Sequence, residues 1–318
     1  MKVSAAFLER SAGETGFQPA ILEKVIRLGA LANEITRHPL LGNALLLKGG
    51  TALNLGFGPP GRLSVDLDFN YVGALDREVM LAERPGIEAA LESLCDRLGF
   101  RVQRSADAFA GRSYYLGYPR TTGGTDRIEI DLNFLFRSPI GDPVIVELWQ
   151  PGGLDHLPAR VVSLDELCIG KLLAMLDRTA PRDAWDVTRL PNIAGATLNS
   201  SGFRERLIAL SIVLTHPIDS YHRDRFAERL TARSISENLW PMLSGGQRPA
   251  ADDLLQSAWE IVKPFLALSE EEAAFLRSAQ RGEFRPDLLG QTATVVVELA
   301  NHPAIKWKLG HIRKRLRQ

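Results

Sequence analysis

The chain has 318 residues, of which 45% are hydrophobic and 24% are charged, and its 38 basic side chains balance 38 acidic ones. This composition excludes a disordered or collagen-like protein, and no apolar run approaches the roughly 18 residues that span a membrane, so no membrane partner is expected. At about 150 residues per domain, the length predicts two domains.

Helical and strand patterns alternate from the start of the chain. Residues 18–37 place apolar side chains at helical spacing and predict a helix. The short apolar run at 44–47 predicts a buried strand, which ends in a glycine turn at Gly49 and Gly50. A short helix is expected over 51–55. The glycine turn therefore joins a buried strand to a helix.

Two later segments carry the clearest strand signals. Over residues 63–71 apolar and polar side chains alternate strictly, which is typical of a strand with one buried face. Residues 126–136 alternate in the same way, and an amphipathic helix predicted at 87–98 lies between the two strands. The amino-terminal region, residues 1–155, is therefore expected to be built on a sheet.

Strand signals fade from about residue 156, and helical patterns dominate the rest of the chain. A capping box that begins at Ser163 predicts a helix as far as about Arg178. Further helices are predicted at 203–214, 250–267, 270–279 and 287–300. The expected fold class is α+β, with a sheet-bearing domain at 1–155 and a helical domain at 156–318.

A pair of acids on the first alternating strand is the main chemical signal. Asp66 and Asp68 are two residues apart, so they share one strand face with Cα atoms about 6–7 Å apart. Two carboxylates directed at one point repel each other unless a cation lies between them, and Mg²⁺ prefers such oxygen ligands. Asp131 supplies a third carboxylate if the two alternating strands are neighbours. Three such acids are typical of a two-metal phosphoryl-transfer site, whereas an isolated pair is more often a solvated sheet face.

The glycine turn before this strand has the composition of a phosphate-binding element. Its sequence is Lys48-Gly49-Gly50-Thr51, so backbone N–H groups and a hydroxyl are available to hold a triphosphate where the helix begins. A plain tight turn is the alternative interpretation. The turn and the acid pair, taken together, favour a nucleotide site.

A second group of charged residues follows in the helical region. Lys171 and Arg178 are seven residues apart and share one helix face. Arg182, Asp183 and Asp186 follow on the next predicted helix, at spacings of three and four residues. Surface ion pairing across a helix bend is the alternative for any one of them. The complete set, downstream of the acid pair, favours a functional role.

The chain resembles the nucleotidyltransferase superfamily in two runs, KGGTAL from Lys48 and RLSVDLDF from Arg62. Within that superfamily it is similar to the AbiEii toxins of bacterial toxin–antitoxin systems and their MenT relatives. The set from Lys171 to Asp186 resembles a later motif of that family, and the run HPAIKWK from His302 is a third similarity. The resemblance implies a nucleotidyltransferase-like mixed sheet flanked by helices, followed by a helical domain that completes the active-site cleft and binds the acceptor.

The resemblance also implies a reaction and roles for these residues. An enzyme of this kind moves a nucleoside monophosphate from a nucleoside triphosphate (NTP) to an acceptor hydroxyl and releases pyrophosphate. Asp66, Asp68 and Asp131 would hold two Mg²⁺ ions, and Asp131 is also a candidate to take the hydroxyl proton. Lys171 would neutralise the β- and γ-phosphates. The rest of the second group would close the cleft around the nucleotide: Arg178, Arg182, Asp183 and Asp186.

Partners follow from the same resemblance. The implied acceptor is RNA, in particular the 3′ end of tRNA, whose extension would block translation, and a cognate antitoxin is the implied protein partner. The last 18 residues carry six basic side chains and Trp307 without an acid, which suits RNA, although a solvated cationic helix end is the alternative. Two other functions stay open: transfer to a protein or small antibiotic, and a non-catalytic nucleotide- or RNA-binding module.

Cysteine usage and the start of the chain favour a cytoplasmic location. Cys95 and Cys168 lack the spacing of a disulfide scaffold or a zinc site. The first residues, MKVSAAFLERSAGETGF, contain a charge within their only apolar stretch, unlike a secretory signal. A reducing, cytoplasmic setting is therefore expected.

Overall fold

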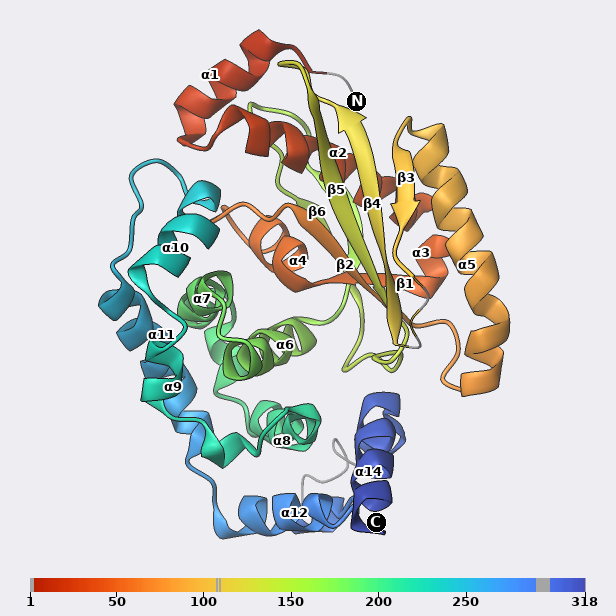
Figure 1. Ribbon diagram of the computed structural model, residues 1–318, viewed down its shortest axis with the longest axis vertical. Helices are drawn as coiled ribbons and strands as arrows, with labels where there is room; N and C mark the ends of the chain where they lie inside the picture. The colour runs from red at the N-terminus through yellow and green to blue at the C-terminus, as the bar shows by residue number, and fades with distance from the viewer. Residues whose placement is uncertain (1–2, 107, 109, 290–297, 318) are drawn as a thin grey trace. The chain divides into compact units, whose positions relative to one another are not determined.

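The computed structural model describes residues 3–106, 108, 110–289 and 298–317 (Figure 1). The chain divides into two compact units. The first unit contains Met1–Ser163 and Leu239–Arg248, and the second contains Leu164–Asn238 and Pro249–Gln318. No described helix is long and apolar enough to cross a membrane.

A seven-stranded mixed sheet forms the centre of the first unit, in the order β3-β4-β5-β2-β1-β7-β6 (Figure 1). Its strands are β1 Leu45–Lys48, β2 Asp66–Tyr71, β3 Arg101–Arg104, β4 Gly111–Pro119, β5 Thr125–Asn133, β6 Val144–Leu148 and β7 Leu157–Val161. Strand β2 is antiparallel to β1 on one side and parallel to β5 on the other. The alternating segments expected at 63–71 and 126–136 correspond to β2 and β5, and these two strands are neighbours in the sheet.

Two long helices cover one face of this sheet. The helices of the first unit are α1 Ala5–Thr15, α2 Pro19–Arg37, α3 Leu41–Ala44, α4 Gly49–Gly56 and α5 Arg77–Arg97. Arg27 of α2 stacks on the ring of Tyr118. Glu88 of α5 forms an ion pair with Arg112. Tyr118 and Arg112 are both even-numbered residues of β4, so α2 and α5 pack against the face to which those residues point.

Strand β2 shows why that covered face is the core. Leu67, Phe69 and Tyr71 alternate with polar residues and are at most 2% exposed. Ile130 and Leu132 lie beside them on β5 and are buried as well. Burying each such side chain contributes about 1.5–3 kcal/mol, and a one-residue slip would move the whole apolar set to the other face. This register therefore gathers the polar residues of β2 and β5 on the opposite face.

Four strands of the sheet are absent from the sequence expectations: β3, β4, β6 and β7. In β4 the outward positions include Tyr115 and Gly117, which obscure the alternation of apolar and polar residues. Strand β7 pairs in parallel with β1 through Leu47 and Val161. The sheet therefore extends beyond the boundary expected at residue 155.

A short segment from late in the chain also belongs to the first unit. It contains a 3₁₀ turn, Trp240–Met242. The Leu63 N–H donates a hydrogen bond of 2.8 Å to the Met242 carbonyl, and the Gly245 N–H donates one of 2.7 Å to the Gly16 carbonyl. The first contact holds the chain just before β2 and the second holds the end of α1, and no local sequence pattern predicts either.

The second unit is helical. Its helices are α6 Leu164–Asp177, α7 Pro181–Leu198, α8 Ser201–Leu210, α9 Arg223–Ala227, α10 Ala232–Asn238, α11 Ala251–Leu266, α12 Glu270–Gln280 and α14 Pro303–Leu316. The helices expected at 250–267 and 270–279 are confirmed as α11 and α12. The helix expected at 203–214 ends earlier, because a 3₁₀ turn follows α8. The helix expected at 287–300 includes 290–297, which lie outside the described residues.

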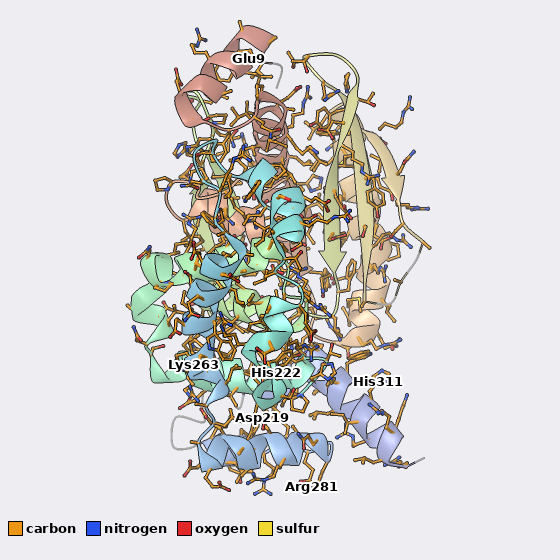
Figure 2. The ribbon with its side chains drawn as sticks, turned by 60° about the vertical axis from the view of Figure 1, so that its left-hand side comes forward. Glu9, Asp219, His222, Lys263, Arg281 and His311 are labelled. Carbon is orange, nitrogen blue, oxygen red and sulfur yellow. The ribbon has the colours of Figure 1, made fainter. Side chains whose placement is uncertain are left out.

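The basic carboxy-terminal helix α14 is partly committed to the fold. Lys308 and Arg313 donate hydrogen bonds to backbone carbonyls elsewhere in the second unit. Trp307 is 45% exposed, and its ring lies 4.3 Å from that of His311, which Figure 2 labels. The other basic side chains of the helix and its end are exposed: Lys306, Lys314, Arg315 and Arg317. These four remain available to a polyanion.

The two cysteines are expected to resist thiol reagents in the folded protein. Cys95 and Cys168 are fully buried and unpaired with each other. Burial raises the pKa of both thiols to about 12, so almost no reactive thiolate forms at neutral pH. Labelling with a chromogenic disulfide should be negligible in buffer and reach both thiols in denaturant. Rapid labelling of the native protein would contradict this packing.

Candidate active site

Carboxylates gather on the polar face of the sheet where β2 and β5 run side by side. Asp68 of β2 is paired in register with Asp131 of β5, and Asp66 is paired with Glu129. Paired residues of neighbouring strands point to the same face, with the strands about 4.8 Å apart. The three acids that the sequence analysis selects therefore lie on one small surface. Asp66 and Asp68 come from β2, and Asp131 comes from β5.

Glu129 is a fourth acid on this surface, and the sequence analysis does not include it among the site residues. Burial raises the pKa of Glu129 above its ordinary value, and the negative charges of Asp131 and Asp66 raise it further. The signal that could have found it is the alternation at 126–136, since Glu129 and Asp131 occupy the same strand face. Four carboxylates in one place make a strongly negative surface that a cation would stabilise.

Hydroxyl groups hold two of these carboxylates in position. The Ser113 hydroxyl, from β4, donates a hydrogen bond to Asp131. The Ser64 hydroxyl donates one of 3.0 Å to Oδ1 of Asp66. The side chains are thus oriented by neighbours on the same face before any ligand binds.

The glycine turn lies directly against the acid pair. Gly49 has a φ of +74°, and a Cβ atom there would lie 2.2 Å from Oδ2 of Asp68. A Cβ atom on Gly50 would lie 2.7 Å from the Arg62 guanidinium and 2.8 Å from the Ser64 hydroxyl. Gly49 is required by its left-handed φ as well as by this approach. A side chain at Gly50 would have to displace the ends of the Arg62 and Ser64 side chains.

Lys48 and Thr51 flank the turn in different ways. Lys48 is paired across the strands with Asp68, so it shares the polar face with the carboxylates. Thr51 is fully buried, and its hydroxyl donates to the Asp66 carbonyl. This hydroxyl therefore anchors the start of β2. The expectation that it holds phosphate gains no support from this contact, whereas the backbone N–H groups at the start of α4 stay candidates.

Replacing Gly49 with alanine is expected to displace the Asp68 carboxylate and abolish activity. The left-handed φ should cost about 1–2 kcal/mol of stability, and the clash with Oδ2 should add to it. Gly58→Ala is the matched control, because Gly58 has a φ of +86° but open space around its Cβ position. Thermal unfolding and initial rates measure the two effects. Equal activity in both variants would show that the Gly49–Asp68 approach is unimportant.

The acid cluster has the donor atoms, but not the closed geometry, of a magnesium site. Across 3–106, 108, 110–289 and 298–317, no group of three or more His, Cys, Asp or Glu side chains is placed to hold a metal ion as it stands. The donor chemistry nevertheless fits magnesium, because Asp66, Asp68 and Asp131 offer only hard carboxylate oxygens. The carboxylates of Asp131 and Asp66 repel that of Glu129, and a divalent cation would offset this concentration of negative charge.

The second group of predicted residues forms two ion pairs within the helical unit. Nζ of Lys171, on α6, lies 2.6 Å from Oδ2 of Asp186, on α7. Arg178 makes two hydrogen bonds of 2.8 and 2.9 Å to the two carboxylate oxygens of Asp183. Arg182 lies in the first turn of α7. The structure therefore joins Lys171 to Asp186 and Arg178 to Asp183.

Burial distinguishes this group from surface ion pairing. The side chain of Lys171 is 7% exposed and that of Asp186 is 0% exposed. Asp183 is also buried, whereas Arg178 is 66% exposed. The interpretation of these residues as a solvated surface network is therefore wrong for the Lys171–Asp186 pair. A buried ion pair needs each partner, because removal of one leaves an uncompensated charge.

The fold and the site together define a class of protein. A mixed sheet that places an Asp-x-Asp strand beside a glycine turn, with a further acid on the next strand, is the arrangement of nucleotidyltransferases. Residues 32–262 match the family described as nucleotidyl transferase AbiEii toxin, type IV toxin–antitoxin system. The chain belongs to this family, and it is therefore a nucleotidyltransferase toxin that uses an NTP and has a partner antitoxin.

A solved structure supports the fold. The chain is similar to MenT4, a nucleotidyltransferase toxin from Mycobacterium tuberculosis H37Rv, with a TM-score of 0.61 and 19% sequence identity. The match covers 94% of this chain and 99% of that one. Comparison with curated proteins finds no match. The similarity confirms the expected mixed sheet with flanking helices.

Proposed function

We propose that this toxin transfers a nucleoside monophosphate to the 3′ end of an RNA, with tRNA as the principal acceptor, in a magnesium-dependent reaction that blocks translation. One observation carries the proposal. The register of β2 against β5 places Asp66 and Asp68 beside Asp131, on the face where Gly49 approaches Asp68. This arrangement offers negative ligands for cations and, at the adjacent turn, backbone donors for phosphate.

The reaction is a displacement at the α-phosphorus of the NTP. The acceptor hydroxyl oxygen forms a new bond to that phosphorus, the bond to the bridging oxygen breaks, and pyrophosphate leaves with its electron pair. Asp131 is the proposed acceptor of the hydroxyl proton. The backbone around Gly49 and Gly50, with Lys48 on the same face, would hold the leaving phosphates.

Magnesium would be held by Asp66, Asp68 and Asp131. When bound, the ions would neutralise triphosphate charge and lower the pKa of the acceptor hydroxyl. Ser64 and Ser113 would keep two of these carboxylates oriented toward the same face, through the hydrogen bonds that they already make.

The helical unit would contribute through two ion pairs. Lys171 is the proposed counter-charge for the β- and γ-phosphates, with Asp186 holding its ammonium group. Asp183 would fix Arg178, whose exposed guanidinium would contact an anion. Arg182 would add positive charge at the start of α7. The exposed basic residues of α14 are proposed to contact RNA phosphates.

The proposal is tested by incubating the purified toxin with total tRNA, magnesium and each α-labelled NTP in turn. Label should enter tRNA with one or more NTPs and should require the metal. Parallel reactions with total cell protein and with an aminoglycoside test the other acceptor classes. Label in protein or antibiotic, with none in RNA, would overturn the choice of acceptor, and no metal-dependent turnover of any NTP would favour the non-catalytic alternative.

A further inference from the structure

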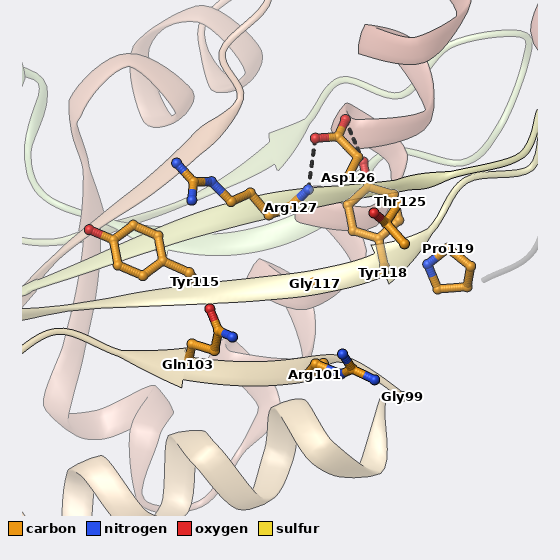
Figure 3. A pocket seen from close by; sticks show the side chains of 10 residues that line it. All are labelled: Gly99, Arg101, Gln103, Tyr115, Gly117, Tyr118, Pro119, Thr125, Asp126 and Arg127. Atoms are coloured by element: carbon orange, nitrogen blue, oxygen red, sulfur yellow. Dashed lines mark hydrogen bonds between the residues drawn. The ribbon is translucent and has the colours of Figure 1, made fainter.

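An open groove lies on the outer three strands of the sheet, away from the acid cluster (Figure 3). Its volume is about 700 Å³, within the range of small-ligand sites. The groove, which we call the β3–β5 groove, is lined by Gly99, Arg101, Gln103, Tyr115, Gly117, Tyr118, Pro119, Thr125, Asp126 and Arg127. None of these residues belongs to the acid cluster or to the glycine turn.

Strand register places the odd-numbered strand residues that line this groove on the same face as the carboxylates, whereas Tyr118 and Asp126 point to the face that α2 covers. Gln103 of β3 is paired with Tyr115 of β4, which is paired with Glu129 of β5, and Glu129 is paired with Asp66 of β2. Because paired residues share a face, these four form one row across the sheet. Three strand spacings of about 4.8 Å cover the row, which puts Tyr115 roughly 10 Å from Asp66.

The groove combines an aromatic ring with two guanidinium groups. Arg127 lies over the ring of Tyr115, with its Cζ 5.0 Å from the ring centre. Arg101 and Arg127 are exposed, and Tyr115 is half-buried. Aromatic rings and guanidinium planes on an open sheet face are suited to stack unpaired bases, while the positive charges attract phosphate.

The acid in the groove is compensated, so the groove as a whole favours an anion. Asp126 forms an ion pair of 2.9 Å with Lys24 of α2 and accepts a hydrogen bond of 2.7 Å from the Arg127 backbone N–H. Figure 3 shows the Asp126 carboxylate turned back toward the backbone N–H of Arg127, the next residue of β5. Glu129, beyond Arg127 on β5, marks the edge of the acid cluster.

Gly117 leaves the floor of the groove without a side chain. It is paired with Arg101 on one side and Arg127 on the other. A Cβ atom there would lie 3.7 Å from the nearest atoms, those of Arg101, which is ordinary contact. Glycine is therefore not required by the fold at this position. A glycine inside a strand then marks a place where another molecule can approach the backbone closely.

We propose that the β3–β5 groove binds an unpaired nucleotide of the acceptor RNA, upstream of the 3′-terminal residue that reacts. The inference rests on the proposed function and adds a recognition site to it. The order of strands supports this assignment, because the glycine turn follows β1 on one side of β2, and the groove begins at β5 on the other. The carboxylates thus lie between the proposed phosphate-binding turn and the groove.

The test measures RNA binding without NTP or metal. A fluorescent single-stranded RNA hexamer is titrated with the full-length protein, and anisotropy gives the Kd. Gly117→Leu should fill the groove and weaken binding about 10-fold or more, and Tyr115→Leu should do the same while Tyr115→Phe does not. Arg127→Gln should weaken binding and reduce its salt dependence. A blunt RNA duplex should bind more weakly than the hexamer, because its bases are already stacked.

Matched variants on α5, which covers the opposite face of the sheet, serve as controls. Gly86 is exposed and has no atom within 4 Å of its Cβ position, so Gly86→Leu makes the same change elsewhere. Arg97→Gln removes the same charge from an exposed site. Wild-type binding by Gly117→Leu and Tyr115→Leu, or equal affinity for duplex RNA, would overturn the proposal.

RNA binding and nucleotidyl transfer are measured in separate assays, so that the groove and the proposed reaction can fail independently. Asp68→Asn should bind the hexamer at least as tightly as the wild type while it loses transfer, because the groove does not include Asp68 and the change removes a negative charge from the same sheet face. Groove-dependent RNA binding in a protein that transfers no nucleotide would support the groove and refute the proposed reaction. Transfer to tRNA that is unaffected by the groove variants at limiting RNA concentration would refute the groove alone.

Discussion

Replacing Asp68 with asparagine is expected to lower the rate of nucleotidyl transfer by a factor of about 10³ or more. Asparagine keeps the shape of the side chain but removes a negative oxygen from the surface that would hold the cation, and loss of that charge stabilisation is worth several kcal/mol in the transition state. Initial rates of pyrophosphate release measure the effect. The fold should not suffer, because the change relieves repulsion among four neighbouring acids.

Thermal unfolding separates this result from simple misfolding. The melting temperature of Asp68→Asn should equal or exceed that of the wild type. Asp96→Asn is the control, because Asp96 is an exposed acid at the end of α5 and its loss should leave both rate and stability unchanged. An Asp68→Asn protein that keeps a tenth or more of the wild-type rate would contradict the assignment of the site.

Removing the charge of Lys171 is expected to damage stability as well as activity. Lys171 and Asp186 form a buried pair, and the loss of one partner of such a pair typically costs about 3–5 kcal/mol. Urea denaturation of Lys171→Met should show this loss, together with the loss of transfer.

A double variant distinguishes the structural role from the chemical one. Lys171→Met with Asp186→Leu removes both charges, so it should recover most of the stability that the single variant loses. It should not recover transfer. Arg233→Met is the control, because Arg233 belongs to an exposed pair on α10 and should change stability by less than about 1 kcal/mol. Restored transfer in the double variant would exclude a catalytic role for the pair.

The sequence predicts the centre of the first unit well, and the reason is physical. Strict alternation in the segment that becomes β2 fixes which side chains are buried, so the shared face of Asp66 and Asp68 follows directly. The turn at Gly49 and Gly50 is equally local. The position of Asp131 beside this pair can be predicted only if β2 and β5 are known to be neighbours. The sequence does not show that pairing, which the structure provides.

The remaining features depend on contacts between distant segments. Strand β4 carries Tyr115 and Gly117 on its polar face, and without β4 the groove has no floor. The burial of Lys171 is invisible in a spacing of charged residues, because solvent exposure depends on how α6 packs against α7. The segment that follows Asn238 returns to the first unit through backbone hydrogen bonds, which carry no side-chain signature.

Nucleotidyl transfer is tested most directly by following the two ends of the NTP in parallel reactions. The toxin is incubated with tRNA and magnesium, once with α-labelled and once with γ-labelled NTP, beside the Asp68→Asn variant. We predict α-label in the RNA and γ-label in pyrophosphate, with neither product formed by the variant. Transfer of γ-label to the RNA, or unchanged transfer by the variant, would contradict it.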